Sequence, residues 1–443
     1  MNPTDLKKPI HVMKFGGTSV ATPSLIQNAA QRIADRRKSG VHVVCVVSAM
    51  GDTTDNLMSL ARQISERPPN RELDVLLSAG EVQSMALLSM ALQEIGIAAR
   101  SFTGSQGGIR TDTQHSEARI LHIDPDRIVS ALAKDEVVVL AGFQGHDERD
   151  EITTLGRGGS DTSAVAMAAA LGAELCEILT DVTGVYSADP RIVDGARQIE
   201  SLGYDEMLEM ANLGARVLHG RSVEMARRFE VPLVVASSTR NTPGTRIVGK
   251  ETDMEKVEIR AVTDDRNVKK ISLVSVPDTP GVAANIFGAL GELGVNVRLI
   301  VQAQSHAGNN DITFVVPGDT HIDQQQLDDL VKQVGGENWI VDERIALLNI
   351  IGEGISREPG IAGSIFRILA DQQINLDLIS SSNLVITCVV SEEDLVRGTR
   401  ALQEDCRVAL MRNTAVFNSV PRNQGVSEYS STGGQEQTRF LSP

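Results

Sequence analysis

The chain has 443 residues, about three times the size of a usual single domain, so two or three domains are expected. With 41% hydrophobic and 23% charged residues, the composition excludes disordered, collagen-like and coiled-coil proteins. The formal net charge of -16 argues against nucleic acid or an anionic membrane as the main partner and favours small molecules.

The apolar stretches and the cysteines point to the cytoplasm. The longest apolar runs, 41–47 and 137–143, are strand-sized, and the N-terminus has no apolar signal core, so no membrane contact is expected. The four cysteines are widely spaced in apolar segments: Cys45, Cys176, Cys388 and Cys406. We expect reduced, buried thiols that neither pair nor bind a metal.

The first 250 residues alternate short Val- and Ile-rich runs with longer amphipathic or Ala-rich runs. This pattern predicts a sheet of βα units with helices on its faces, an α/β sandwich. Strands are expected at 12–15, 41–47, 137–141, 177–180 and 231–236, and helices through 28–36 and up to about 171. Each strand runs into Gly, Ser, Thr or Asp at its C-terminal end, which is the edge where open α/β sheets bind ligands.

The pattern changes near residue 257 and then occurs twice. Strand, Pro-Gly turn, helix, strand and strand are followed by the same order again, with matching anchors 79 residues apart: Pro280-Gly281 with Pro359-Gly360, Phe287 with Phe366, and Asn296 with Asn375. We predict a duplication with modules at 265–340 and 341–420, and a strand near 256–262 that contributes to the pair. Because each module is small and has an exposed sheet edge, the copies should pack on each other or on another chain.

The ends of the second module are less regular. An acidic helix is expected from Glu392. Residues 422–443 are polar and rich in Gly and Ser, so we expect a disordered tail.

The segment KFGGTSV at 14–20 places two glycines at a strand-to-helix junction, directly after Lys14 and a phenylalanine. Glycines let the backbone approach an anion, a helix N-terminus offers free N–H groups, and Lys14 adds a positive charge. The segment predicts a phosphate site of a kind other than the P-loop, in which the Lys follows the glycines. A tight turn beside a solvated Lys is the alternative.

The segment TTLGRGGSDTSA at 153–164 combines glycines with Arg157 and then opens an Ala-rich helix with Ser160 and Asp161. As an alternative to a binding site, Ser160 could cap the helix and Asp161 could complement its dipole. Capping leaves Arg157 unexplained, and the planar fork of an arginine suits a substrate carboxylate. The spacing favours a binding loop.

Three further segments are less specific. LTDVTGVYSADPR at 179–191 is a strand followed by a polar loop, which fits a site and an ordinary turn equally well. SAMGDTTDNL at 48–57 and SAGE at 78–81 are both expected where a strand or turn gives way to a helix. Thr53, Thr54 and Glu81 could orient an amino acid there or could simply cap helices.

Taken together, these five segments resemble the aspartate kinases, the members of the amino acid kinase family that carry ACT domains. The paired modules that begin VPDTPG and SREPG are also similar to the family's, and all these motifs occur in the family's order. The resemblance extends to about residue 415. It implies an amino-acid-kinase-type α/β/α sandwich over 1–250 followed by two α+β ACT modules of βαββαβ, ferredoxin-like topology.

The resemblance also implies an activity. Such an enzyme transfers the γ-phosphoryl group of ATP to the β-carboxylate of L-aspartate, the first step toward lysine, threonine, methionine and isoleucine. End-product amino acids would bind the ACT modules and inhibit, and the chain would form a homodimer or a higher homo-oligomer through these modules.

Site residues follow by matching this sequence to the family's motifs. Lys14 and Asp161 would be catalytic, and Mg²⁺ would arrive with ATP, held by no dedicated protein ligands except possible contact with Asp161. ATP would contact Lys14, Gly16, Gly17, Ser19, Gly158, Gly159, Thr180, Asp181, Tyr186, Arg191 and Arg216. Aspartate would contact Ser48, Thr54, Glu81 and Arg157, with Arg157 on its α-carboxylate and Glu81 on its ammonium group.

Two departures from the family stand out. Arg216 occupies a position where the family usually has a Lys that reaches the nucleotide phosphates, so a planar fork replaces a point charge. Effector binding is implied for Asp278 and Gly281 in the first module, for Asn296 and Gln302 on its next strand, and for Asn375 and Ser381 in the second module. The second module reads Ser-Ser-Ser-Asn at 380–383 where the family often has Ser-Thr-Ser-Glu, which leaves lysine, threonine, both or neither as the effector.

Two other functions compete with the aspartate kinase. Arg216 and the duplicated modules would also suit an amino-acid sensor whose kinase domain is inactive. A kinase for glutamate, acetylglutamate or a nucleotide could use the same sheet, although such relatives usually lack the ACT pair.

Overall fold

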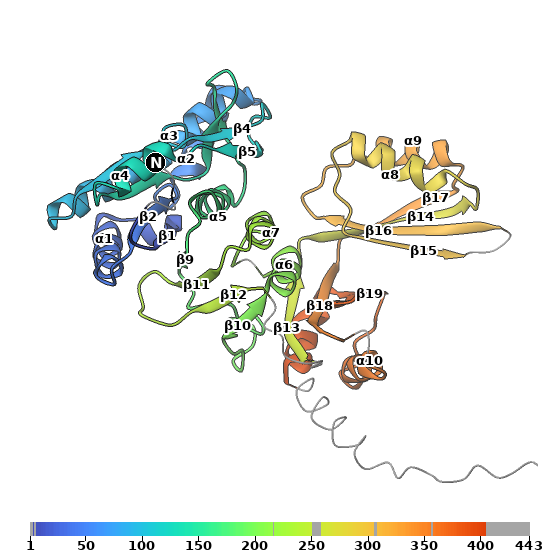
Figure 1. Cartoon of the computed structure of the whole chain (residues 1–443). Helices are drawn as coiled ribbons and strands as arrows, with labels where there is room; N and C mark the ends of the chain where they lie inside the picture. The colour runs from blue at the N-terminus through green and yellow to red at the C-terminus, as the bar shows by residue number, and fades with distance from the viewer. Residues whose placement is uncertain are drawn as a thin grey trace, which may run out of the picture.

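The computed structural model describes residue 3 and residues 6–215, 217–249, 258–304, 308–355 and 358–404. The predictions for Arg216, Cys406 and the tail at 422–443 lie outside these residues. The chain forms an N-terminal lobe, blue to green in Figure 1, and a C-terminal lobe, yellow to red.

The N-terminal lobe is built on an eight-stranded sheet with the order β10-β12-β11-β9-β1-β2-β6-β3. Its strands are β1 (Ile10–Phe15), β2 (His42–Val47), β3 (Ala99–Phe102), β6 (Val137–Ala141), β9 (Leu175–Thr180), β10 (Ser201–Gly203), β11 (Leu233–Ser237) and β12 (Thr245–Val248). Neighbouring strands run parallel from β11 to β3, and β12 is antiparallel to β11. The five strands predicted from the sequence are confirmed as β1, β2, β6, β9 and β11.

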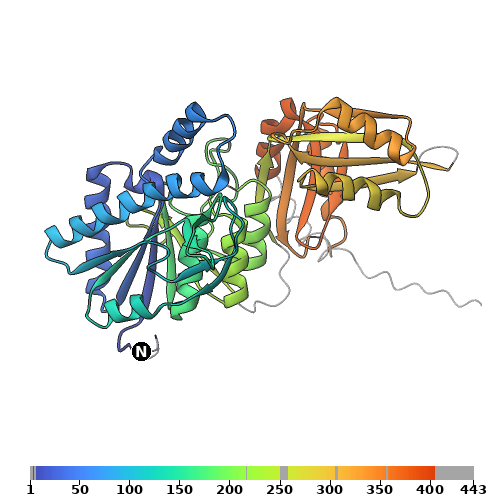
Figure 2. The same cartoon turned by 90° about the horizontal axis from the view of Figure 1, so that it is seen from above.

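Helices cover both faces of this sheet, as expected for a sandwich (Figure 2). Apolar residues of α1 (Pro23–Lys38) and α3 (Asn70–Glu94) pack with Met13 and Phe15 on one face. Apolar residues of α4 (Asp126–Leu132), α5 (Gly159–Leu171), α6 (Tyr204–Asn212) and α7 (Gly220–Phe229) pack with Val12 on the other. Alternate residues of β1 are thus buried on opposite faces of the sheet, which is why the strand has apolar residues at both odd and even positions.

Helix α3 is the one helix in the described part of the chain that is long and apolar enough to cross a membrane. Half of its most apolar window is buried inside the protein, where it contacts α1, β3 and β6. This packing is that of the core helix of a globular domain. The shorter α2 (Thr53–Ile64) lies against it.

A small second sheet in the same lobe has the order β5-β4-β7-β8. It comprises β4 (Ile109–Thr111), β5 (Ile120–Ile123), β7 (Gln144–His146) and β8 (Ile152–Thr154). Strand β8 ends directly before the glycine-rich segment that leads into α5. A 3₁₀ helix, η2 (Gly17–Val20), follows β1.

The first C-terminal module has the complete βαββαβ order. It contains β14 (Val268–Pro277), α8 (Val282–Glu292), β15 (Leu299–Gln304), β16 (Asn309–Pro317), α9 (Gln324–Val334) and β17 (Asn338–Asp342). The antiparallel sheet has the order β15-β16-β14-β17, and both helices lie on the same face of it (Figure 1).

The second module repeats this plan with one strand taken from elsewhere. Its sheet has the order β13-β18-β20-β19, from β13 (Glu258–Asp265), β18 (Ile345–Glu353), β19 (Leu378–Ser381) and β20 (Val385–Ser391), with α10 (Ile361–Asp371) packed on it. Residues 392–394 and 395–404 then form a 3₁₀ turn and a helix. Because β13 precedes the first module in the chain, that module is inserted between two paired strands of the second.

The predicted duplication is confirmed by the helix starts. Gly281 and Gly360 are the N-cap residues of α8 and α10, with φ of 98° and 95°. This left-handed conformation favours glycine, so the same backbone requirement fixes the same residue 79 positions later. The copies also pack on each other, through a shared apolar cluster that includes Val268 and Val315 from one and Leu347 from the other.

The two lobes meet where α6 ends. The backbone oxygen of Leu213 accepts a hydrogen bond from Thr263 Oγ1 at 2.6 Å and another from Asn349 Nδ2 at 3.2 Å. Asn349 is fully buried, and its Oδ1 accepts from Thr387 Oγ1 at 2.9 Å. At Gly214, with φ of 113°, a Cβ atom would lie 2.1 Å from the backbone oxygen of Asp264. The second module is therefore held against the N-terminal lobe by buried polar contacts as well as apolar packing.

Candidate active site

A cavity of about 290 Å³ lies at the carboxyl edge of the large sheet. It is lined by residues that follow β1, β2 and β6, by α3, and by the segment that opens α5. Of the predicted site residues, the structure brings nine together here: Lys14, Gly17, Ser48, Thr54, Glu81, Arg157, Gly158, Gly159 and Asp161. The remaining lining comes from Ala49, Gly51, Phe143, Gly156 and Ser160.

Lys14 and Asp161 form an ion pair inside this cavity. The distance between Lys14 Nζ and Asp161 Oδ1 is 2.6 Å, and each residue is only 9% exposed. Lys14 stands near the end of the central strand β1, whereas Asp161 is in the first turn of α5, where the helix dipole stabilises a carboxylate. A lysine this deeply buried needs a partner to stay charged, so Asp161 holds the ammonium group in place at the cavity wall.

Glycines shape the wall beside this pair. Gly156 and Gly158 have φ of 74° and 73°, and a Cβ atom at Gly158 would lie 2.3 Å from the side chain of His219. Gly158 is the N-cap of α5, so the alternative in which Ser160 caps this helix is wrong. Only a glycine meets both the left-handed conformation and the close approach. The free N–H groups of the first turn of α5 therefore border the cavity.

Glu81 is buried in the same wall at 3% exposure. Its Oε1 accepts a hydrogen bond from the Ala49 N–H at 3.0 Å, while its buried Oε2 has no partner among the described residues. Burial raises the pKa of this carboxyl from 4.5 to about 7, although the Ala49 hydrogen bond acts in the opposite direction. An unsatisfied, buried carboxylate oxygen at a cavity is suited to bind a cation.

The prediction that residues 78–81 lie where a helix begins is wrong. They lie in the middle of α3, and Gly80 allows this helix to approach the loop after β2, since a Cβ there would be 2.7 Å from the Ala49 side chain. Apolar residues occur on most sides of α3, so no amphipathic period marks where this helix begins. Ser48 and Thr54 fall where expected, after β2 and in the first turn of α2.

Arg157 is exposed at the cavity mouth. Within the described parts of the chain, no hydrogen-bond or ion-pair partner engages its guanidinium group. It follows the left-handed Gly156 and precedes the left-handed Gly158, which fixes its backbone without side-chain contacts. Such an arginine is available for an anionic ligand.

The other predicted nucleotide residues lie outside the cavity lining. Gly16 N–H and Ser19 Oγ both donate to the Leu179 backbone oxygen, at 3.2 and 3.5 Å, and thereby join the end of β1 to β9. Thr180 and Asp181 follow at the end of β9, with Thr180 Oγ1 donating to Asp181 Oδ1 at 3.0 Å.

Tyr186 and Arg191 lie farther along the same loop. The Tyr186 hydroxyl is 2.6 Å from Thr183 Oγ1, and the 86% exposed Arg191 side chain pairs with Asp189 at 2.7 Å.

Sequence reasoning missed two neighbours of the pair. Phe143 has a φ of 66° and follows β6, and its N–H donates to Ser163 Oγ at 3.1 Å. His219 lies against Gly158, and burial lowers the pKa of its imidazole. His219 ends the segment NLGARVLH, in which Arg216 alone is predicted to be functional.

All six predicted effector residues are exposed on the C-terminal modules. Asp278 and Gly281 lie at the start of α8, whereas Asn296 follows its end and Gln302 is in β15. Asn296 thus precedes β15 and is not on that strand as expected. An 11-residue helix separates Gly281 from Asn296, about 16 Å, so one module does not bring them together. Asn375 and Ser381 lie before β19 and at its end.

The described cysteines lie outside the lining of this cavity. Cys45, Cys176 and Cys388 are buried and unpaired, and burial raises the pKa of each thiol. The described residues contain no group of three or more His, Cys, Asp or Glu side chains that could hold a metal ion. Asp161 and Glu81 are the carboxylates that line the cavity.

Substituting the two ends of α5 should separate backbone strain from crowding. Gly158→Ala and Gly172→Ala both place a Cβ on a left-handed residue, at the N-cap and C-cap of the same helix, but Gly172 has open space around it. We expect Gly172→Ala to lower the free energy of unfolding by about 1 kcal/mol and Gly158→Ala by clearly more. Urea denaturation measures both, and equal losses would contradict the crowding by His219.

The buried Glu81 should make stability depend on pH. Above pH 4.5 the unfolded chain releases the proton that the folded protein keeps until about pH 7, so the free energy of unfolding falls as pH rises through this window. Relative to Glu81→Gln, wild type should lose on the order of 3 kcal/mol between pH 4 and pH 8. Glu94→Gln, at the exposed end of the same helix, serves as the control and should follow wild type. A pH-independent difference for Glu81→Gln would contradict the raised pKa.

Comparison with known proteins agrees with this arrangement. Residues 9–237 match the amino acid kinase family, and residues 271–336 and 348–405 each match an ACT domain. The aspartokinase of Mycolicibacterium smegmatis is 45% identical over 400 residues, which cover 89% of this chain and 95% of that protein. The aspartokinase of Corynebacterium glutamicum is 43% identical over 417 residues, covering 93% and 99%.

Solved structures give the same result. The crystal structure of E. coli aspartokinase III in complex with aspartate and ADP, in its R-state, is similar with a TM-score of 0.75 at 27% identity, covering 89% of this chain and 99% of that one. The same enzyme in complex with lysine and aspartate, in its T-state, has a TM-score of 0.69 at 26% identity with the same coverage. The chain therefore belongs to the aspartokinases, the amino acid kinases that carry paired C-terminal ACT domains.

Proposed function

We propose that this chain phosphorylates the β-carboxylate of L-aspartate with ATP and forms 4-phospho-L-aspartate, the first step toward lysine, threonine, methionine and isoleucine. The observation that carries the proposal is the charge pattern of one cavity. It holds a buried lysine, an unpaired arginine and a buried glutamate with a free oxygen. Two anionic groups and one ammonium group can be bound there together, as a phosphate donor and an acidic amino acid require.

The chemical step needs charge neutralisation more than proton transfer. The β-carboxylate is already ionised at neutral pH, so its oxygen can attack the γ-phosphorus without a general base while the bond to the β-phosphate oxygen breaks and ADP leaves. Lys14 would neutralise the transferring group, and Asp161 would keep the Lys14 ammonium in position. The N-terminus of α5, which begins at Gly159 after the N-cap Gly158, would contribute further positive potential through the helix dipole.

Aspartate would be held by the opposite side of the cavity. Arg157 would bind the α-carboxylate through its planar fork, and Glu81 would accept from the ammonium group through its free Oε2. Ser48 and Thr54 would line the pocket between these two groups. A bound ammonium would stabilise the charged form of Glu81 and so lower its pKa from the value near 7.

ATP would lie along the edge formed by β1 and β9. These strands are parallel neighbours, so Thr180 and Asp181 stand at the same edge as Lys14. We assign contacts with the nucleotide to Lys14, Gly16, Gly17, Ser19, Gly158, Gly159, Thr180, Asp181, Tyr186, Arg191 and Arg216. Mg²⁺ bound with ATP supplies neutralisation of the phosphate oxygens, and Asp161 is the carboxylate on this side of the cavity that would hold it.

The activity is tested by trapping the product with hydroxylamine. With ATP, Mg²⁺ and aspartate, wild type should form aspartyl hydroxamate, and Lys14→Ala should lower kcat at least about 100-fold, equivalent to about 3 kcal/mol of transition-state stabilisation. Lys38→Ala removes an exposed lysine at the end of α1 and should leave kcat unchanged.

Three outcomes would overturn the proposal. Absence of hydroxamate with wild type would end it, and unchanged turnover in Lys14→Ala would favour an amino-acid sensor. A higher kcat/KM for glutamate or acetylglutamate than for aspartate would assign another substrate to the same cavity.

Regulation is proposed for the C-terminal modules. Asp278, Gly281, Asn296, Gln302, Asn375 and Ser381 would bind a feedback amino acid, lysine or threonine, across an interface between modules. Gly281 and Asn296 lie at opposite ends of α8 within one module. An interface between two modules would bring such residues together, which supports assembly of two chains. We place the enzyme in the cytoplasm, whose reducing conditions suit its unpaired thiols.

A thermal-shift screen against the twenty amino acids, combined with light scattering, tests this regulation. Lysine, threonine or both should raise the melting temperature, because a ligand that binds only the folded state stabilises it. The mass should be at least about twice the 47.6 kDa of one chain. A monomer at micromolar concentration, with and without these amino acids, would contradict the proposal.

A further inference from the structure

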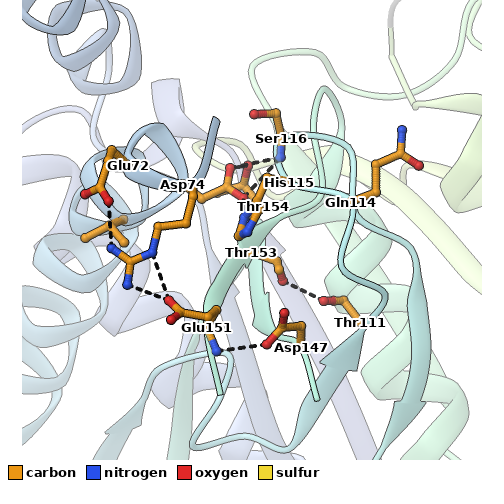
Figure 3. Close-up of polar contacts among 12 residues, drawn as sticks. Glu72, Asp74, Thr111, Gln114, His115, Ser116, Asp147, Glu151, Thr153 and Thr154 are labelled. Carbon is orange, nitrogen blue, oxygen red and sulfur yellow. Dashed lines mark hydrogen bonds and ion pairs between the residues drawn. The ribbon is translucent and has the colours of Figure 1, made fainter. Parts of the chain in front are cut away.

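Asp74 lies outside the cavity lining. It joins helix α3 to residues 115–116 and to Thr154 at the end of β8 (Figure 3). This residue of α3 is fully buried. Its carboxylate accepts hydrogen bonds from the Ser116 N–H at 3.0 and 3.1 Å, from Thr154 Oγ1 at 2.5 Å and from His115 Nδ1 at 2.7 Å. A buried carboxylate is stable when several donors surround it, so these contacts form one fixed unit.

The segment fixed by Asp74 is the one that delivers Arg157. Thr154 is the last residue of β8 and stands three positions before Arg157. Residues 116–118 run beside it: the Ala118 N–H donates to the Thr154 backbone oxygen at 2.9 Å, and a Cβ at Gly156 would lie 3.0 Å from the backbone oxygen of Ser116. Asp74 therefore holds two adjacent segments, residues 116–118 and the end of β8, which together support the loop of Arg157.

A second clamp acts on the same support from the other side. Arg221, in α7, donates to the backbone oxygens of Leu155 at 2.8 Å and Ala118 at 2.6 Å. With Asp74 and Arg221 bound to neighbouring residues, the path of the chain up to Gly156 is determined by hydrogen bonds. The Arg157 side chain needs no partner of its own to be presented to the cavity.

Asp74 also shares its helix with Glu81. The two residues are seven positions apart, about two turns, and therefore lie on the same face of α3. Glu81 contacts the loop after β2, whereas Asp74 contacts the support of Arg157. The ammonium and the α-carboxylate of an amino acid are attached to the same carbon, so the groups that bind them must lie a fixed distance apart. One rigid helix sets this distance between Glu81 and the loop of Arg157.

We infer that Asp74 is a positioning residue for aspartate, which acts on Arg157 through Thr154 and Ser116. The inference rests on the function proposed above. It concerns aspartate: most of the described residues assigned to the nucleotide lie along β1, η2, β9 and the loop after β9. Gly158 and Gly159 belong to the start of α5, and none of these residues bonds to Asp74. Loss of Asp74 should therefore weaken aspartate binding and leave ATP binding intact.

Asp147 offers a matched control. It is also buried, at 4% exposure, and follows β7 of the small sheet. Its Oδ1 accepts from the N–H groups of Arg149 at 2.8 Å and Glu151 at 2.9 Å. These contacts stay within the turn between β7 and β8, as Figure 3 shows for Glu151. Asp147→Ala thus removes a buried carboxylate and its two bonds from backbone N–H groups, and removes no bond to residues 116–118 or Thr154.

The experiment compares steady-state constants in the full chain. We expect Asp74→Ala to raise KM for aspartate about 10-fold or more while KM for ATP stays within about twofold, and Asp147→Ala to change neither beyond about twofold. Asp74→Asn keeps an acceptor oxygen for Ser116 and Thr154 and should restore most of the aspartate affinity. Melting temperatures of both alanine variants report the loss of stability separately.

A second pair of variants covers the case in which Asp74→Ala does not fold. Thr154→Val loses the bond to Asp74, whereas Thr153→Val loses a bond from Thr153 Oγ1 to Thr111 Oγ1 at 2.6 Å, and both threonines are buried. Only Thr154→Val should raise KM for aspartate. Equal aspartate KM values within either pair, or an equal rise in KM for ATP, would overturn the inference. Absence of hydroxamate with wild type would instead refute the proposed function.

Discussion

The buried ion pair between Lys14 and Asp161 joins the middle strand of a parallel sheet to the start of a helix. Removing either charge would leave the other uncompensated in a wall that is 9% exposed, so the end of β1 and the first turn of α5 have to meet closely. That approach is possible because Gly142 admits the side chain of Ser160 and Gly158 admits His219. The glycines around the cavity are therefore consequences of where two charges must be placed, as much as of ligand binding.

Helix α3 provides the second fixed reference for the cavity. The helix is apolar enough to be buried along much of its length, yet it carries Asp74 and Glu81 on one face, and each orders backbone N–H groups that belong to loops. Because apolar packing on the sheet fixes this helix, the side chains of Asp74 and Glu81 can hold such loops in fixed positions. This explains how an exposed loop such as that of Arg157 can be placed accurately without contacts of its own side chain.

Much of this arrangement could be predicted from the sequence, because parallel strands deliver their carboxyl ends to one edge. Lys14, Ser48 and Arg157 converge for that reason, and the paired glycines at 281 and 360 revealed the duplication. Positions whose role depends on distant partners could not be found in this way. Asp74 bonds to residues 41 to 80 positions away, so no local motif marks it. Glu81 could be recognised as a candidate, but its place in the middle of α3 could not. The alternative in which Ser160 caps α5 is wrong because the left-handed Gly158 takes that position, which capping propensity alone does not reveal.

The carbonyl of Leu213 has both of its lone pairs engaged by donors from β13 and β18. This oxygen belongs to the connection between α6 and α7, and the far end of that connection is His219, whose side chain lies against Gly158. A movement of the second module relative to α6 must either sever two buried hydrogen bonds or drag the start of α7 with it. The contact between the lobes at Leu213 and the cavity wall at Gly158 are thus joined by one short connection, residues 213–219.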